Sequence, residues 1–137
     1  MNTTQTQTRT GAFPAWANED LTDLAPRILT PVYANDRMEV ALPATATTAI
    51  PYLLIDGNEA GQEVTCQPLT SETNARVELA GSCLPGQTLV LADSAVAADK
   101  GKVRNLPTDP GSYVQVWIAE DSGTDGDFIL LRPFKFG

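Results

Sequence analysis

The segment AEDSGTDGDFILL, residues 119–131, has a dense group of potential ligand side chains. Its three carboxylates are Asp121, Asp125 and Asp127. Aspartates at such intervals are typical ligands of calcium. An EF-hand loop that began at the first of them would need an oxygen ligand at its third position and a glutamate at its twelfth, where this chain has Gly123 and Arg132. We therefore predict a hairpin turn, in which the Asp-Gly pair at 125–126 supplies the positive-φ turn residues.

Other chemistry finds little support, because the chain has no histidine. That absence removes the Ser-His-Asp and Cys-His constellations and any histidine-based zinc site. No phosphate-binding G-x-x-x-x-G-K-[ST] loop occurs. A pair of carboxylates could still hydrolyse a glycoside, but 17 acidic residues provide many chance pairs. We expect a protein that is not an enzyme and has no cofactor and no metal site.

The two cysteines, Cys66 and Cys83, are 17 positions apart and fit no zinc-ligand spacing. No segment resembles a secretory signal, so synthesis in the cytoplasm is expected, where thiols stay reduced. We predict two free, partly buried thiols. A disulfide between them is the alternative if the mature particle meets an oxidising medium.

The net charge of −8 excludes several classes of partner. An acidic protein of pI about 4.3 is repelled by nucleic acid and by anionic membrane surfaces. The longest clear apolar run, at 49–55, has seven residues and contains a proline, whereas a membrane span needs about 20. We expect neither nucleic acid nor a membrane among the partners.

The sequence predicts strands, because apolar residues recur with a period of two from residue 27 onward. The residues expected to face the core are Met38, Val40, Leu42, Val77, Leu79, Val103, Val114, Val116 and Ile118. The residues expected on the opposite faces are Arg37, Glu39, Arg76, Glu78, Lys102, Arg104, Gln115 and Trp117. Turn signals at 56–58, 85–86, 109–111 and 125–126 separate the strands.

Eight or nine short strands over roughly 28–136 predict an all-β fold, a small single-domain β-barrel or sandwich. The stretch at 93–101 is equally compatible with a short helix and a loop. The row formed by Lys100, Lys102 and Arg104 is expected to be a solvated strand face, with a basic ridge for an acidic partner as the alternative.

Residues 1–26 differ in composition and predict an extended N-terminal arm in front of a domain at 27–137. A polar Thr/Gln-rich leader is followed by an aromatic cluster that includes Phe13, Pro14 and Trp16. We predict that the arm orders on a target and carries much of the affinity. The alternative is that the aromatic residues of this segment cover the end of the protein's own barrel.

Candidate protein-interface residues follow from the same aromatic pattern, since large aromatic side chains are enriched where proteins bind each other. They are Phe13, Pro14, Trp16, Trp117, Phe134 and Phe136. For the tryptophans, covering the edge of the protein's own core is an equally good interpretation. Phe134 and Phe136, which alternate around Lys135, either close the sheet or dock on a neighbouring subunit.

The order of motifs over residues 84–134 resembles the capsid cement, or head-decoration, proteins of tailed bacteriophages. These β-rich proteins carry a "pGq-v" strand, a "gkv" strand, a "G-a-e" strand and a "g-v-v-V-rl" ending. The corresponding pieces here are Pro85-Gly86-Gln87, Gly101-Lys102-Val103, residues 116–120 and residues 127–132. The third piece departs from the family pattern, because VQVWIAE is bulkier than the small-residue strand.

The resemblance implies a structural virion protein, made in the host cytoplasm, that binds the outer surface of an expanded capsid and stabilises the head. The family commonly forms homotrimers near three-fold or quasi-three-fold axes and reaches neighbouring capsomers with an N-terminal arm. The implied partners are the major capsid protein and further copies of the chain. A tail or baseplate component, or a carbohydrate-binding module, remains an alternative.

Overall fold

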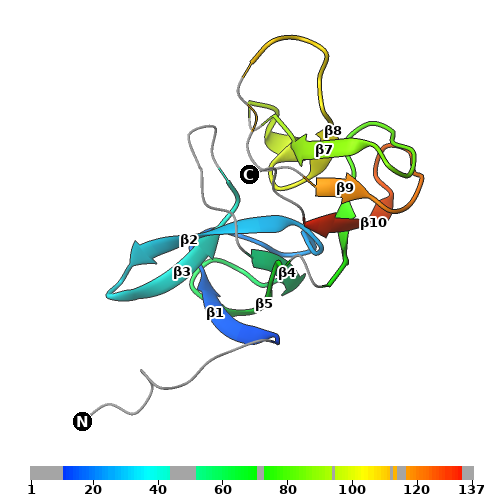
Figure 1. Cartoon of the computed structure of the whole chain (residues 1–137). Helices are drawn as coiled ribbons and strands as arrows, with labels where there is room; N and C mark the ends of the chain where they lie inside the picture. The colour runs from blue at the N-terminus through cyan, green and yellow to red at the C-terminus, as the bar shows by residue number, and fades with distance from the viewer. Residues whose placement is uncertain are drawn as a thin grey trace.

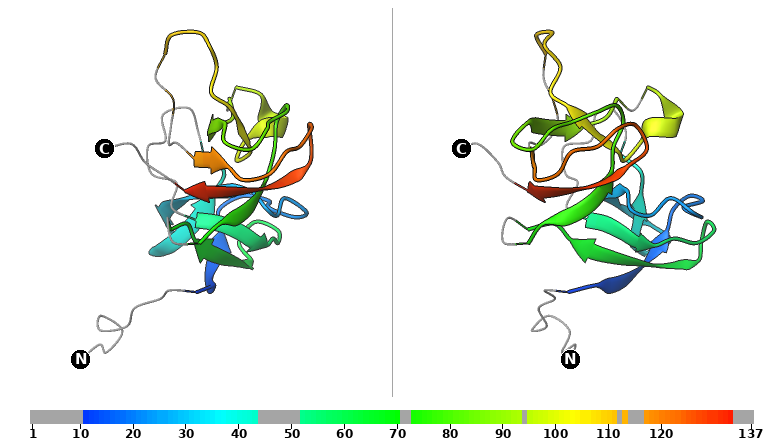
Figure 2. Two further views of the ribbon diagram at one scale, coloured as in Figure 1. Left: turned by 45° about the vertical axis from the view of Figure 1, so that its right-hand side comes forward. Right: turned by 90° about the vertical axis from the view of Figure 1, so that its right-hand side faces the viewer.

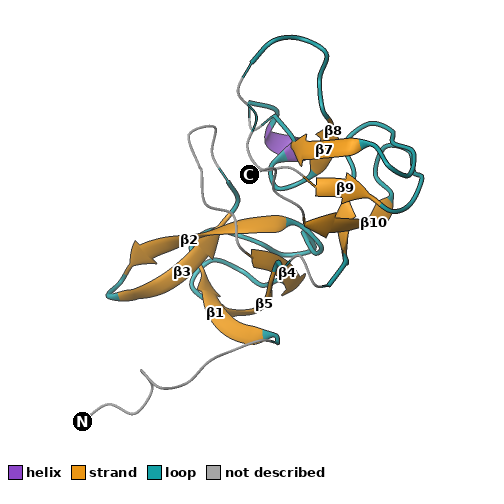
Figure 3. Ribbon diagram, in the orientation of Figure 1, coloured by secondary structure: helices purple, strands orange, loops and turns teal. Residues whose placement is uncertain are grey.

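The computed structural model describes residues 11–43, 52–70, 73–93, 95–111, 113 and 117–133, and these contain ten strands and no α-helix (Figures 1 and 3). The first five strands are β1 (Phe13–Ala17), β2 (Ile28–Ala34), β3 (Arg37–Ala41), β4 (Tyr52–Asp56) and β5 (Glu63–Pro68). The second five are β6 (Ala75–Glu78), β7 (Thr88–Leu91), β8 (Val103–Asn105), β9 (Trp117–Ala119) and β10 (Phe128–Pro133). In the stretch at 93–101, of which residue 94 lies outside the described residues, the helical segment is a single 3₁₀ turn, η2 (Ala97–Asp99).

The first five strands form a closed barrel in the order β1-β3-β2-β4-β5. Strand β1 closes it by pairing parallel with β3 and antiparallel with β5. Alternate residues of β1 point inward because side chains of a strand alternate between its faces. The interior is filled by Phe13, Ala15, Ala17, Leu21, Leu29, Val40, Leu54, Val64 and Cys66.

The last five strands form a second sheet in the order β6-β10-β9-β7-β8 (Figure 2). A bridge from Leu79 to Val103 joins its two ends, and the amide of Ala80 donates to the carbonyl of Val103 at 2.8 Å. This sheet therefore also curls back on itself around an apolar centre. The centre includes Ile28 and Leu53 from barrel strands, so the two sheets share packed residues.

Two loops of the second sheet, at 80–87 and 120–127, have the same order of bends, bridge and turn and are hydrogen-bonded to each other, although Gly81 has a positive φ of 95° and its equivalent, Asp121, does not. Cys83 and Gly123 exchange two backbone hydrogen bonds, of 3.0 and 3.1 Å. The next-to-last residue of each loop is a glycine at positive φ, Gly86 at 88° and Gly126 at 87°. The amide of Gly86 donates to Ala119 O, and that of Gly126 donates to Leu79 O. All equivalent positions differ by 40 in number, so the strand-loop-strand unit occurs twice.

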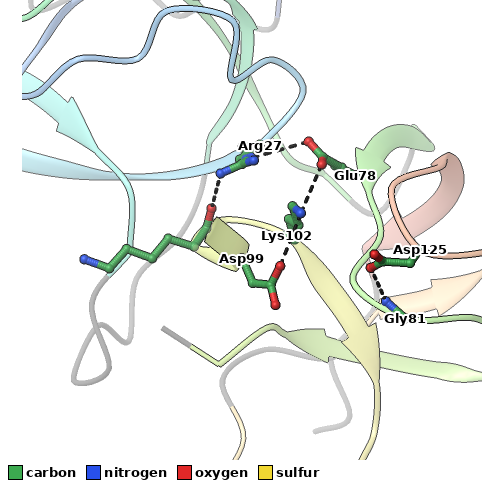
Figure 4. A network of polar contacts seen from close by, with 7 residues as sticks. Arg27, Glu78, Gly81, Asp99, Lys102 and Asp125 are labelled. Carbon is green, nitrogen blue, oxygen red and sulfur yellow. Dashed lines mark hydrogen bonds and ion pairs between the residues drawn. The ribbon is translucent and has the colours of Figure 1, made fainter. Parts of the chain in front are cut away.

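An ion-pair network links the two sheets (Figure 4). Arg27, just before β2, contacts the Glu78 carboxylate at 3.4 Å and the carbonyl of Lys100 at 3.3 Å. Lys102 contacts Glu78 and Asp99, each at 3.2 Å. Burial would lower the pKa of Lys102, but the hydrogen bonds and charges of these carboxylates outweigh it and raise that pKa. The network holds the charged form of a lysine that is largely covered.

The predicted all-β fold with a small barrel is confirmed, but the predicted arm at 1–26 is wrong for the part that contains β1. Residues 13–17 are a barrel strand that pairs with β3 and β5, and its residues 13, 15 and 17 are buried. All five of its residues are apolar and one is proline, so the sequence shows no period-two pattern there. Residues 1–10 lie outside the described residues.

Three predicted strand faces are wrong at individual positions. Glu39 is only 2% exposed, whereas Met38, expected inside, is 39% exposed. Lys102 is buried in the ion-pair network rather than solvated, and Trp117 belongs to the core of the second sheet. For Glu39 and Lys102, polar partners that include residues from distant segments offset the cost of burying a charge. Val77, Leu79 and Val103 are buried as predicted.

Both cysteines are buried and free, and they lie in different cores. Cys66 is in the barrel interior, where burial raises the pKa of its thiol to about 11. Cys83 is in the core of the second sheet. The described residues contain no helix long and apolar enough to span a membrane.

Candidate functional site

The structure separates the six aromatic and proline residues predicted for an interface. Phe13 lies inside the barrel, where its ring meets Tyr52 edge-on at 5.1 Å between centroids. Trp117 is 3% exposed. Pro14 is exposed on the outside of β1, and Trp16 is half-buried. Phe134 and Phe136 lie outside the described residues.

The exposed apolar side chains are different ones from those predicted. They are Tyr33, Met38, Ile55, Leu84, Val96, Leu106 and Phe128. The largest exposed fraction, 72%, belongs to Tyr33. Scattered apolar residues are normal on a surface, so only those that share a structural feature are informative. Tyr33 and Met38 are such a pair, because they are directly opposite each other in the β2–β3 hairpin.

The β2–β3 hairpin extends away from the rest of the barrel (Figure 1), and we refer to its residues 31–38 as the hairpin tip. Its two turn residues, Asn35 and Asp36, have φ angles of 52° and 58°. Two consecutive positive-φ residues define the turn type whose twist matches that of paired strands. Asn and Asp are the side chains that tolerate this conformation best. The sequence therefore specifies a tight and regular tip.

A buried carboxylate braces the tip. Glu39 accepts hydrogen bonds from the amide groups of Asn18 at 2.9 Å and Asn35 at 3.0 Å, and from Arg37 Nε at 2.9 Å. These hydrogen bonds lower the pKa of Glu39 to about 2. The carboxylate is therefore ionised at neutral pH and fixes the turn residue Asn35 to the body of the barrel.

Trp16 supports the same group of residues through its contact with Arg37. The guanidinium carbon of Arg37 lies 4.6 Å from the Trp16 ring centroid, a cation–π arrangement. The predicted interface residue Trp16 thus supports the hairpin. Asn18, which directly follows β1, donates its side-chain amide to the Glu39 carboxylate.

A second surface feature is an open groove where the barrel meets the second sheet, and we call it the junction groove. Its volume is about 500 Å³. It is lined by Ala25, Pro26, Leu53, Leu54, Ile55, Gln67, Asn74, Ala75, Arg76 and Leu130. Most of these side chains are apolar, and the polar ones are amides and one guanidinium. Such a lining suits protein contact better than it suits catalysis.

A β-bulge shapes the junction groove. The register between β4 and β5 shifts between Leu54 and Asp56, so that Ile55 has no direct partner. Bulges redirect side chains, and Ile55 is 43% exposed at the groove.

The aspartates of the 119–131 segment hold backbone amides in the second sheet's loops. Asp125 accepts from Gly81 N at 2.9 Å, and Asp127 accepts from Thr124 N at 2.8 Å. Asp121 accepts from Ser122 N at 2.9 Å. No group of three potential metal ligands occurs in the described residues. The predicted turn is confirmed at 125–126, where Gly126 has a φ of 87°, but Asp125 is not at positive φ as predicted. The loop that contains this turn also forms hydrogen bonds with the loop at 80–87.

The sequence contained a signal for the hairpin tip that we did not use. The Asn35-Asp36 pair lies between two alternating segments, which is the pattern of a two-residue hairpin. The junction groove had no such signal, because its residues come from five separate parts of the chain.

Comparison with known proteins gives one informative result. No protein-family model and no curated protein matches the chain. Among solved structures, it is similar to the head fiber gp8.5 N base of bacteriophage phi29, with a TM-score of 0.67. The two are 21% identical, and the match covers 92% of this chain and 97% of that chain. The likeness extends over the whole fold, the barrel and the second sheet together.

Proposed function

We propose that this protein is a structural component of a phage virion that binds the outer surface of the expanded capsid and stabilises it. The observation that carries the proposal is the similarity of nearly the whole chain to the base of a phage head fiber. The motif order over 84–134, which resembles capsid cement proteins, supports it from the sequence. The protein acts by binding and not by catalysis, and its partners are the major capsid protein and other copies of itself.

We further propose that it binds as a homotrimer near three-fold or quasi-three-fold axes. Repetition over a closed shell then multiplies many moderate contacts, so that no single contact needs to be strong. The surfaces suited to such contacts are the hairpin tip and the junction groove, which combine exposed apolar groups with a fixed backbone.

The test is to add the purified full chain to expanded heads that lack it and to image them by electron microscopy. We expect regular density on the outer surface at three-fold or quasi-three-fold positions. Unexpanded heads are the matched control and should bind less protein. Density on the tail or baseplate, or no density on either form of head, would contradict the proposal.

A further inference from the structure

The hairpin tip is a projecting surface with an exposed apolar pair. Tyr33 and Met38 are 72% and 39% exposed, and they form a cross-strand pair. Such pairs pack against each other and present a joint apolar surface. Asp36 lies beside them, exposed, and accepts a hydrogen bond from the Tyr33 hydroxyl at 3.2 Å. The tip therefore combines an aromatic ring and a carboxylate.

The tip also has an unpaired strand edge. In a two-residue hairpin the residues that flank the turn, Ala34 and Arg37, form a hydrogen-bonded pair, so the backbone N–H and C=O of Tyr33 face away from β3. Strand β4 covers that side only opposite Ile28 and Leu29. Among the described residues, no strand pairs with β2 along the outer side of Tyr33.

The junction groove contains a second unpaired edge. The amide of Glu78 donates to Pro26 O at 3.1 Å, and so it points away from β10. Because hydrogen-bonding directions alternate along an antiparallel strand, the N–H and C=O of Arg76 point the same way, into the groove that Arg76 lines. The groove thus offers a strand edge beside apolar side chains.

The charges of the two surfaces are complementary. The exposed guanidinium of Arg76 donates to Phe128 O at 3.1 Å and forms no ion pair within the part of the chain that the structure describes. The net charge of −8 makes two copies repel each other in general. A basic side chain at the groove and Asp36 at the tip provide a local attraction that fixes where copies meet.

We propose that the hairpin tip of one copy inserts into the junction groove of a second copy. Tyr33 packs against Ile55 and Leu130, Asp36 pairs with Arg76, and the outer edge of β2 adds to β6. The two surfaces are different parts of the molecule, so the contact is heterologous and three copies close it into a ring. This inference rests on the trimer in the proposed function and identifies its interface.

The brace of the hairpin favours this role. A rigid element loses less conformational entropy when it binds than a mobile one does. Glu39 fixes Asn35 at the turn, and Trp16 stacks below Arg37. The hairpin tip is therefore already ordered in the free protein, before it contacts a second copy.

Sedimentation of the full chain over a wide concentration range tests the interface. We expect a wild-type trimer, and we expect Tyr33→Ala and Ile55→Asp to weaken it by about tenfold or more. Both side chains are exposed in one copy, so the melting temperature of the monomer should change little. The matched controls are Leu84→Ala and Leu106→Asp, at apolar positions that are 62% and 46% exposed and outside both surfaces. A wild-type monomer, or controls as damaging as the test variants, would overturn the proposal.

Mixing the two variants gives a sharper test. Tyr33→Ala keeps an intact groove and Ile55→Asp keeps an intact tip, so one functional contact forms between them and an open dimer results. A mixture that stays monomeric would show that Tyr33 and Ile55 do not lie on opposite sides of one contact between copies, which overturns the proposal.

A cysteine pair, Tyr33→Cys with Ile55→Cys, reports the contact directly. Oxidation should give covalent trimers in denaturing gels under non-reducing conditions, since native Cys66 and Cys83 are buried. Absence of any interchain product would overturn the tip-to-groove contact. Binding to expanded heads is measured separately: a chain that decorates heads without this contact refutes only the interface, and a chain that forms the ring without binding heads refutes only the capsid role.

Discussion

At the scale of single residues, Glu39 shows why a charged side chain on a strand can be placed on the wrong face from sequence. Period-two alternation put it outside with Arg37, and by polarity alone that assignment is sound. Its burial depends on Asn18, which is 21 positions away and approaches only once the barrel closes. The same holds for Lys102, which is also buried, because its ion-pair partner Glu78 comes from another strand. Burial of a paired charge is a tertiary property, so a local pattern cannot predict it.

Glu39→Gln should destabilise the protein at neutral pH and matter less as the pH falls. The pKa of Glu39 is lowered from its ordinary value of 4.5 to about 2 in the folded state. Its contribution is therefore fully present above about pH 4.5 and is lost as the pH falls toward 2. We expect the difference in melting temperature between wild type and variant to shrink over this interval in thermal denaturation followed by circular dichroism.

Glu59→Gln, at an exposed position, is the control for removing one negative charge. Its effect on the melting temperature should be small throughout the same range. An equal response of the two variants, or a constant effect of Glu39→Gln down to pH 2, would contradict the brace that Glu39 provides to the hairpin.

At the scale of elements, the number and type of strands could be read from alternation and turn signals, whereas β1 could not. Its five residues include a proline and follow a polar leader, so composition suggested an arm. Pro14 is tolerated because its missing N–H faces the side of β1 toward β3, and β3 pairs with β1 only at Trp16 and Ala17. The paired loops at 80–87 and 120–127 were also hidden, because PGQ and DGD share only the central glycine. Geometry repeats there with little repetition of sequence.

The two possible N-terminal truncations should therefore differ sharply. Deletion of residues 1–17 removes β1, which closes the barrel and buries Phe13, Ala15 and Ala17, and we expect the product not to fold. Deletion of residues 1–10 leaves every described strand intact, and the melting temperature should stay within about 2 °C of that of the full chain. Circular dichroism and thermal melting distinguish the outcomes. A folded 18–137 fragment would restore the arm interpretation for the whole segment.

At the scale of the whole molecule, the shared core makes the barrel and the second sheet one cooperative unit. Ile28 and Leu53 belong to barrel strands, yet they pack among the buried residues of the second sheet. Arg27 adds an ion pair to Glu78 across the same junction, and its carbonyl accepts from Leu54 N at 2.8 Å. This junction also forms the groove proposed to receive a second copy, so subunit contact and internal stability depend on the same segment.

Ile28→Ala tests that cooperativity, because Ile28 is fully buried between the two sheets. Removing a large buried aliphatic side chain costs about 2–5 kcal/mol, and for a domain of this size each kcal/mol corresponds to roughly 3–6 °C in melting temperature. We expect one unfolding transition at a lower temperature, with near-ultraviolet signals of Trp16 in the barrel and Trp117 in the second sheet lost together. Val96→Ala, at a position that is 49% exposed, is the control and should change little. Two separate transitions, with Trp16 and Trp117 melting apart, would show that the sheets are independent units and that the junction is a contact between them rather than a common core.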